Sequence, residues 1–207
     1  MAAFLWVAPL TASATVLHFT LETPSLLGTT AFLAFDFLDG DSVVNNTVTI
    51  SDFATNGTLD VASPTGGASG TLIPGPVTLT DSSPFNSFLQ ALTLGTTLSF
   101  RVNLTEQPSV ALFPDSFVFS LLNNTFSPLF ATTDPFLLDA LFAVDIDGSP
   151  SGALYPFAPT DTGSTVTWTV GPVASIPLPS TAFLIGAGLL GGLAARRRSG
   201  FCAVGRA

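Results

Sequence analysis

Short runs in which apolar and polar residues alternate fill most of the chain between residues 15 and 171. This period-two alternation, rich in Val, Thr and Phe, predicts β-strands that turn one face toward a core. Asp-Gly, Asn-Gly and Gly-Gly pairs separate the runs and favour tight turns. The predicted strands are Thr15–Glu22, Ala31–Phe37, Val43–Phe53, Thr97–Leu104, Ser116–Asn123, a run from Leu137 or Leu138 to Asp147, and Ser164–Val170.

Two stretches depart from this alternation. The stretch Gly70–Thr80 is interrupted by Pro74 and Pro76, which favours an edge strand or a loop because proline cannot donate to a sheet ladder. The stretch from residue 82 to residue 95 predicts a short helix, because four apolar side chains fall at helical spacing: Phe85, Phe88, Leu89 and Leu92. Many short strands and one short helix predict an all-β fold, an antiparallel sandwich of the jelly-roll or Ig-like kind.

The composition narrows the classes of partner. The 207 residues carry a formal net charge of −9 and include no lysine. Between the two ends of the chain, the cationic side chains are Arg101 and, when protonated, His18. Nucleic acid is therefore excluded as a partner, because binding it requires clustered cations. Nineteen phenylalanines are enough to build a core. Cys202 is the single cysteine, so no intramolecular disulfide can form.

The N-terminus resembles a secretory signal. Residues 2–10 form a short apolar run, and Ala12 and Ala14 supply the small-x-small pattern of a cleavage site. Residues 1–14 are therefore predicted to be a signal peptide, with Thr15 as the mature N-terminus. No Lys or Arg precedes the apolar run, which a start codon assigned too late would explain. A buried first strand is the alternative interpretation.

Near the C-terminus, an uncharged run rich in Gly, Leu and Ala ends in three arginines, Arg196, Arg197 and Arg198. Residues 180–198 are predicted to form a single transmembrane helix with its arginine stop, and residues 199–207 a cytoplasmic tail. The arginines would lie on the cytoplasmic side and the body of the protein outside. The span is short, since sixteen helical residues rise only about 24 Å. A buried core helix is the alternative, and the abrupt arginine stop argues against it.

The order of these features carries a resemblance to a known family. A Pro-x-Pro motif, a serine, a short apolar span and an arginine cluster together resemble the PEP-CTERM sorting signal of exported bacterial proteins. The resemblance implies recognition and cutting by an exosortase-type transpeptidase. The glutamate of the family motif is replaced by Leu178, which is similar to the VPLPA-type variant of the signal. The recognition residues implied by the resemblance are Pro177, Leu178, Pro179 and Ser180.

The predicted domain order follows from these segments. Residues 15–171 form the β-sandwich ectodomain, and residues 172–179 hold a Pro-rich linker and the sorting motif. The resemblance implies a precursor held in the membrane by its C-terminal helix. After processing, the protein is expected at the cell surface or outside the cell, in the exopolysaccharide and biofilm matrix of a Gram-negative bacterium.

The sequence assigns no catalytic residue to the body of the protein. The lone His18 lies on a predicted strand, where histidine is usually structural, and Cys202 lies in the predicted cytoplasmic tail. No obligatory cofactor is predicted. Acidic turns could supply oxygen ligands for Ca²⁺, although an Asp before a Gly also suits a tight turn without any ion. The candidate ligands are Asp36, Asp39, Asp41, Asp145 and Asp147.

Two functions remain open from the sequence. The first is a non-enzymatic exported surface or matrix protein with a structural, adhesive or carbohydrate-binding sandwich. The alternative is a secreted hydrolase that uses paired carboxylates. A shallow groove lined by two carboxylates and aromatic residues would favour the hydrolase. Trp168 is expected in the core, with a carbohydrate contact as its alternative. A further alternative is that the C-terminal helix is a permanent anchor.

Overall fold

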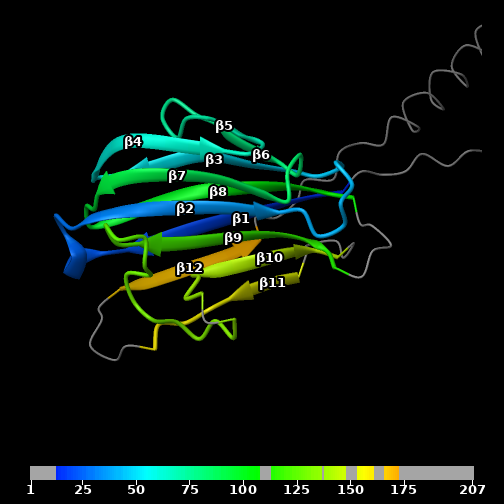
Figure 1. Ribbon diagram of the computed structural model, residues 1–207. Coiled ribbons are helices and arrows are strands. Elements are labelled where there is room, and N and C mark those ends of the chain that lie inside the picture. The colour runs from blue at the N-terminus through cyan, green and yellow to red at the C-terminus, as the bar shows by residue number, and fades with distance from the viewer. Residues whose placement is uncertain (1–12, 108–112, 137, 148–152, 161–165, 173–207) are drawn as a thin grey trace, which may run out of the picture. The chain divides into compact units, whose positions relative to one another are not determined.

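In the computed structural model, the described residues form twelve strands in two antiparallel sheets (Figure 1). It describes residues 13–107, 113–136, 138–147, 153–160 and 166–172. The strands are β1 (Ser13–Glu22), β2 (Thr30–Leu38), β3 (Thr47–Thr55), β4 (Thr58–Thr65), β5 (Ala68–Gly70), β6 (Val77–Thr80), β7 (Phe85–Thr93), β8 (Thr97–Glu106), β9 (Asp115–Leu122), β10 (Phe142–Ile146), β11 (Ala153–Pro156) and β12 (Thr167–Pro172). Sheet A has the order β12-β1-β8-β3-β6-β5, and sheet B has the order β11-β10-β9-β2-β7-β4 and faces the viewer in Figure 1.

Phenylalanines from both sheets form the centre of the core. The rings of Phe19 in sheet A and Phe119 in sheet B have centroids 5.0 Å apart, and those of Phe35 in sheet B and Phe100 in sheet A are 5.1 Å apart. All four side chains are fully buried. These edge-to-face contacts between the sheets establish that the described residues form a β-sandwich with its core between the two inner faces.

The alternation of buried and exposed positions explains why the strands form here. Along β8, residues Leu98, Phe100, Val102 and Leu104 are buried, while the intervening residues face solvent. The all-β prediction is thus confirmed, and each of the seven runs predicted from alternation contains a strand. Strands β4, β5 and β11 were not predicted. Strand β6, predicted as an edge strand or a loop, lies one place inside the edge, because the three-residue β5 covers it.

The predicted helix between residues 82 and 95 is wrong, because this stretch forms strand β7. Its buried positions alternate, as in any strand with one face in the core: Asn86, Phe88, Gln90 and Leu92. The side-chain amides of Asn86 and Gln90 donate hydrogen bonds to the backbone carbonyls of Phe37 and Asp60. These hydrogen bonds offset the free-energy cost of burying two polar side chains. Because Asn86 and Gln90 are polar, the alternation of apolar and polar residues that predicts a strand is not visible in this stretch of the sequence.

The helices that the structure describes are limited to a short 3₁₀ turn, Pro24–Leu26. Within the described ranges, no helix has the length and apolar character that crossing a membrane requires. The predicted transmembrane helix and tail, residues 180–207, lie outside the described residues, as do residues 1–12 of the predicted signal peptide. Strand β1 begins at Ser13, two residues before the predicted mature N-terminus.

Several strand ends meet at one end of the sandwich, which we call the basal end. Ser13, the first residue of β1, pairs with Glu106, the last residue of β8. Pro172, the last residue of β12, pairs with Leu17 near the start of β1. The chain therefore enters the sandwich and leaves it at the basal end, and the loop from β2 to β3 lies there as well.

Candidate functional site

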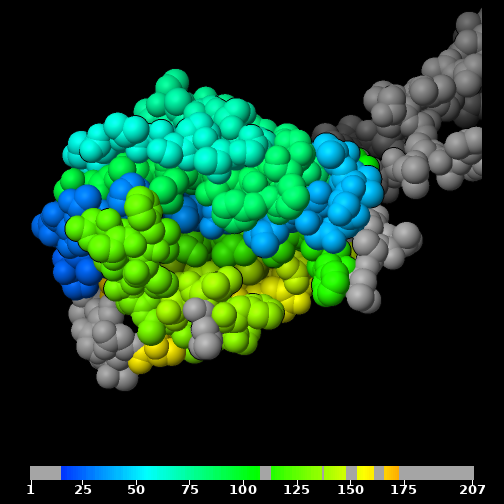
Figure 2. Space-filling model, in the orientation of Figure 1, coloured from blue at the N-terminus to red at the C-terminus, as the bar shows by residue number. Residues whose placement is uncertain are grey.

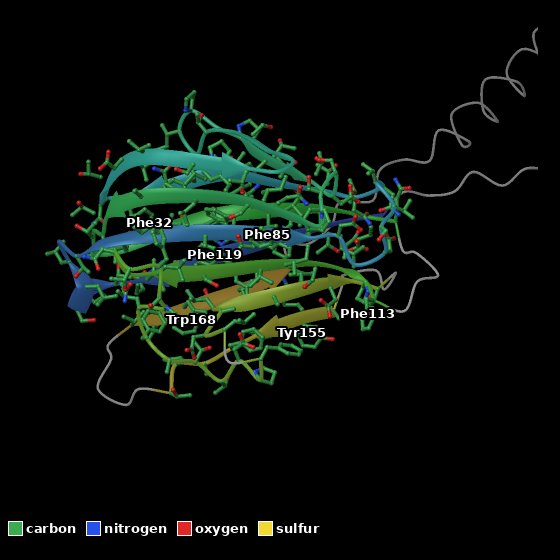
Figure 3. All side chains as sticks on the ribbon, viewed as in Figure 1. Phe32, Phe85, Phe113, Phe119, Tyr155 and Trp168 are labelled. Atoms are coloured by element: carbon green, nitrogen blue, oxygen red, sulfur yellow. The ribbon has the colours of Figure 1, made fainter. Side chains whose placement is uncertain are left out.

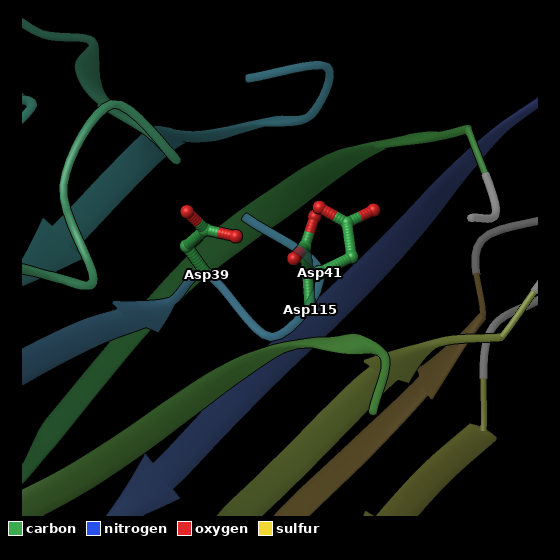
Figure 4. Close-up of side chains that lie close together, drawn as sticks. All are labelled: Asp39, Asp41 and Asp115. Carbon is green, nitrogen blue, oxygen red and sulfur yellow. The ribbon is translucent and has the colours of Figure 1, made fainter. Parts of the chain in front are cut away.

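Three aspartates come together at the basal end (Figure 4). Asp39 and Asp41 lie in the loop after β2, and Asp115 is the first residue of β9. One carboxylate oxygen from each lies within 4.8 Å of those of the other two. Asp115 is buried, whereas Asp39 and Asp41 are partly exposed. We call these three residues the acidic cluster.

Backbone amides fix the geometry of the acidic cluster. The amide of Gly40 donates to Asp115 Oδ1 over 2.9 Å, and the amides of Ser42 and Val43 donate to the carboxylates of Asp39 and Asp41 over 2.6 and 2.7 Å. A Cβ atom on residue 40 would lie 2.1 Å from the carbonyl oxygen of Pro114. Glycine at this position therefore allows the loop to approach β9 closely, and the approach brings the three aspartates together.

A buried asparagine joins the acidic cluster to a fourth carboxylate. Asn46 donates from Nδ2 to Asp115 Oδ2 over 2.8 Å, and its backbone amide donates to Asp81 Oδ2 over 2.6 Å. The amide of Asn45 donates to the same oxygen of Asp81 over 2.9 Å. Asp81 is fully buried, and its Oδ1 has no hydrogen-bond partner in the structure. Burying a carboxylate oxygen without a hydrogen-bond partner lowers the stability of the fold, so a nearby positive charge would stabilise Asp81.

The electrostatics of the acidic cluster follow from burial and like charge. Burial raises the pKa of Asp115 above its ordinary value. Hydrogen bonds from Asn46 and Gly40 act in the opposite direction, and the negative charges of Asp41 and Asp81 add to the rise. The cluster thus holds negative charges close together in a partly buried position. A bound cation would reduce the repulsion between them.

The outer faces of the two sheets differ in character. Sheet A presents mostly Thr, Ser and Asn side chains from β3, β6 and β8. Sheet B presents exposed apolar side chains, either directly or through the segment after β9: Leu38, Phe85, Phe126, Phe136, Leu138 and Tyr155. Large exposed apolar side chains gathered on one face are typical of an interaction surface.

A groove of about 450 Å³ lies on the outer face of sheet B. In Figure 2, which views this face, the yellow-green residues that follow β9 lie over part of the sheet. The groove is mostly apolar, and its aromatic lining comes from Phe136, Tyr155 and Phe157. Two carboxylates, those of Asp134 and Asp145, line it as well. This is the arrangement that was expected to favour a hydrolase.

The two groove carboxylates have different surroundings. Both oxygens of Asp134 accept backbone amides of its own segment, from Phe136 over 2.9 Å and from Ala140 over 3.2 Å. Asp134 is buried and therefore holds the wall of the groove in shape. Asp145 lies on β10, opposite Ser116 of β9, and is partly exposed. Asp145 is thus the groove carboxylate that a ligand could reach.

A third carboxylate shares the outer face of sheet B. Asp36 pairs with Val118, which pairs with Ala143, which in turn pairs with Tyr155. These residues form one row across β2, β9, β10 and β11. Burial raises the pKa of Asp36, and a hydrogen bond from Ser87 opposes the rise. Asp36 therefore lies in the row that leads to the groove, and it is separate from the acidic cluster.

We expect Asp36→Asn to stabilise the fold at neutral pH and to have no such effect near pH 3. The folded-state pKa of Asp36 is raised, so the native state loses stability as pH rises from the unfolded-state pKa through the folded-state pKa. The neutral amide avoids this loss. Melting temperatures of both proteins at pH 3 and pH 7 measure the effect. The exposed Asp60→Asn is the control, and equal effects at the two pH values would contradict the expectation.

The structure separates the five predicted calcium ligands into groups. Asp39 and Asp41 belong to the acidic cluster, Asp36 lies in the row on sheet B, and Asp145 lines the groove. Asp147 directly follows Ile146, which pairs with Asp115, and so lies at the basal end. Sequence reasoning missed Asp115 and Asp81, because each lies far along the chain from the Asp-Gly-Asp turn.

His18 and Trp168, the other residues considered from the sequence, both lie on strands of sheet A. His18 is exposed on the outer face of sheet A and pairs with Arg101 of β8. Trp168 is partly buried against the core, its Nε1 donates to the carbonyl of Leu141 over 3.2 Å, and its ring stacks on that of Phe130 at 5.5 Å. These contacts agree with the expected core position of Trp168. The sorting-motif residues, the arginine stop and Cys202 lie outside the described residues.

Comparison with known proteins gave one finding for this chain. Residues 175–198 match the family model of the PEP-CTERM protein-sorting motif. This range contains the Pro-x-Pro motif, the apolar span and the three arginines. Neither the curated proteins nor the solved structures gave a significant match.

The match confirms the resemblance found in the sequence and bears on the fate of the chain. A PEP-CTERM motif implies an exported, membrane-associated precursor that an exosortase-type enzyme processes. The β-sandwich, which ends at Pro172, comes directly before the matched residues. The chain is therefore an exosortase-targeted exported protein that carries a PEP-CTERM protein-sorting motif after its β-sandwich.

Proposed function

We propose that the chain is a non-enzymatic surface or matrix protein whose sandwich binds extracellular polysaccharide on the outer face of sheet B. The observation that carries the proposal is the groove, in which aromatic side chains and one accessible carboxylate share a concave surface. Aromatic rings can pack against the apolar faces of sugar rings, while a carboxylate accepts hydrogen bonds from their hydroxyl groups. The sorting motif supports the location, since it directs the sandwich out of the cell.

The contrast between the two sheets supports the choice of face. The outer face of sheet A is made mostly of short polar side chains, which water solvates well. On sheet B, Tyr155 and Phe136 are 46% and 78% exposed although both are large and apolar. Exposing such side chains costs solubility unless a ligand covers them. This contrast supports the outer face of sheet B, which carries the groove, as the binding face.

Tyr155→Ala is expected to weaken binding to the polysaccharide of the native host about tenfold, because truncating a central aromatic contact costs more than about 1 kcal/mol. Asp145→Asn tests the hydrogen-bonding part of the site in the same way. Both measurements use the full-length chain and the purified polysaccharide in a titration. Glu22→Gln, an exposed residue on sheet A, is the matched control for Asp145. Unchanged affinity for the polysaccharide in both groove variants would overturn the assignment of the binding site to the groove.

A secreted hydrolase is the second candidate, and one observation favours it. Asp36 and Asp145 lie on the same outer face with β9 between them, so their strands are about 10 Å apart. Asp36 lies opposite Val118 and Asp145 opposite Ser116, so the two residues are also offset by two positions along β9. Carboxyl groups of inverting glycosidases are separated by roughly 6.5–9.5 Å, and their general acid has a raised pKa. Burial raises the pKa of Asp36 in this direction.

An assay for new reducing ends in the same polysaccharide distinguishes a polysaccharide-binding protein from a hydrolase. A binding protein leaves the polymer intact. A hydrolase cuts it, and Asp36→Asn then abolishes cutting while binding persists. Absence of cutting under conditions in which the full-length chain binds would remove the hydrolase.

A further inference from the structure

We propose that the protein binds a calcium ion in the acidic cluster at the basal end, with Asp39, Asp41 and Asp115 as its carboxylate ligands. This inference goes beyond the proposed function, because the basal end and the groove are different sites. It narrows the expectation from the sequence, which included five aspartates without Asp115.

The distances suit a single ion. Calcium holds its oxygen ligands at about 2.3–2.6 Å, so two oxygens on one ion can be at most about 5 Å apart. The three carboxylates each place one oxygen within 4.8 Å of the other two (Figure 4). The three oxygens are thus close enough that small side-chain rotations would bring one oxygen of each aspartate to a single ion. Asp39 and Asp41 are partly exposed, which leaves a path for the ion and for its water ligands.

Asp81 supplies a second, independent observation. This carboxylate is completely buried, and its Oδ1 has no hydrogen-bond partner. Its other oxygen accepts the amide of Asn46, whose side chain donates to Asp115. The charge of Asp81 also acts on Asp115. A cation bound next to Asp115 would compensate the negative charge of Asp81, which is buried one hydrogen-bonded residue away.

No cationic side chain of the described residues compensates this charge. The candidates are Arg101 and His18, which pair with each other near the middle of β8 and β1. Gln107 follows β8 at the basal end, where it is hydrogen-bonded to Asn46. Arg101 lies six residues before Gln107, or about 20 Å along the strand, and its guanidinium contacts Asp52 at 3.3 Å. Four linked carboxylates thus repel one another at the basal end. A divalent cation removes this repulsion and holds the loop against β9.

Calcium suits these ligands better than the other common divalent ions. The donors are all oxygens, which excludes a preference for zinc or copper. Two of the three carboxylates lie on one short loop, so the arrangement is irregular. Calcium accepts irregular shells of six to eight oxygens, whereas magnesium requires a near-ideal octahedron. Three carboxylates and an open side predict a dissociation constant of about 10⁻⁴–10⁻³ M, typical of extracellular modules.

Thermal unfolding of the full-length chain in detergent, after treatment with EDTA, tests the proposal. We expect 10 mM CaCl₂ to raise the melting temperature by about 3–10 °C, as mass action at this affinity requires for a domain of this size. The same concentration of MgCl₂ is expected to give a clearly smaller shift. A calcium shift that is absent overturns the proposal, and an equal shift with magnesium overturns the preference for calcium.

Variants locate the ion. Asp39→Asn and Asp41→Asn keep an oxygen that can accept the loop amides, so the fold persists, but each removes a negative ligand. Each is expected to weaken calcium binding tenfold or more in a titration. Asp60→Asn, an exposed aspartate on β4, should keep the full shift, as should Asp145→Asn in the groove. Retention of the full shift in both loop variants would overturn the assignment to the acidic cluster.

Discussion

A chain in which Pro177 and Pro179 are both replaced by alanine is expected to remain uncut and to accumulate in the membrane fraction of its host. Both prolines lie within the matched sorting motif, residues 175–198. Proline fixes φ and removes a backbone donor, so the double replacement changes both the shape and the hydrogen bonding that a processing enzyme would recognise. The effect should be close to all-or-none, because an unprocessed precursor keeps its whole C-terminal segment.

Intact mass measures this result directly. The natural protein is expected to end near the Pro-x-Pro motif, whereas the variant should keep residues up to 207. Pro64→Ala is the matched control, since Pro64 is an exposed proline on β4 and lies outside the motif. The same C-terminus in the natural protein and the double variant, after allowance for the mass of the two substitutions, would contradict the assignment of these prolines as recognition residues. A full-length natural protein in the membrane would favour a permanent anchor.

The second large effect is expected from Phe119→Ala, which should destabilise the sandwich by about 3–5 kcal/mol. Phe119 is fully buried in β9, the third strand of sheet B (Figure 3). Its ring centroid lies 4.9–5.7 Å from those of four other phenylalanines: Phe19, Phe35, Phe100 and Phe142. Truncation removes the ring that touches both sheets and leaves a cavity between them. A loss of this size approaches the whole stability of many domains.

Urea unfolding of the full-length protein in detergent measures the loss. The midpoint should fall strongly while the slope of the transition stays the same, because the surface exposed on unfolding changes little. Phe85→Ala is the control, since Phe85 is 53% exposed on the outer face of sheet B. It should cost less than about 1 kcal/mol. Similar losses in both variants would mean that the centre of the core has been misplaced.

The sequence predicted the strands well where one face carried only apolar residues. In β8, each buried position is Leu, Phe or Val until Glu106 at its end, so the period of two is evident. In β7 the same period was concealed, because the polar residues Asn86 and Gln90 alternate with Phe88 and Leu92 in the buried positions. Whether a buried amide finds a partner depends on neighbouring strands, and a single strand's sequence does not contain that information.

The candidate sites show the same limit. The Asp-Gly-Asp turn was visible in the sequence, and its two aspartates do form part of the acidic cluster. Asp115 could not be assigned to it, because its approach depends on the pairing of β2 with β9 and on the close contact of Gly40 with Pro114. The groove was equally hidden, since Tyr155 and Phe136 belong to different segments that meet only on the sheet.

The positions of the first residue of β1 and the last residue of β12 at the basal end bear on what processing at the sorting motif does to the fold. Strand β1 starts and β12 ends at the same end of the sandwich, so all the strand pairings of the described residues lie between Ser13 and Pro172. A cut within residues 175–198 would therefore remove the sorting motif and leave every strand pairing of the sandwich intact.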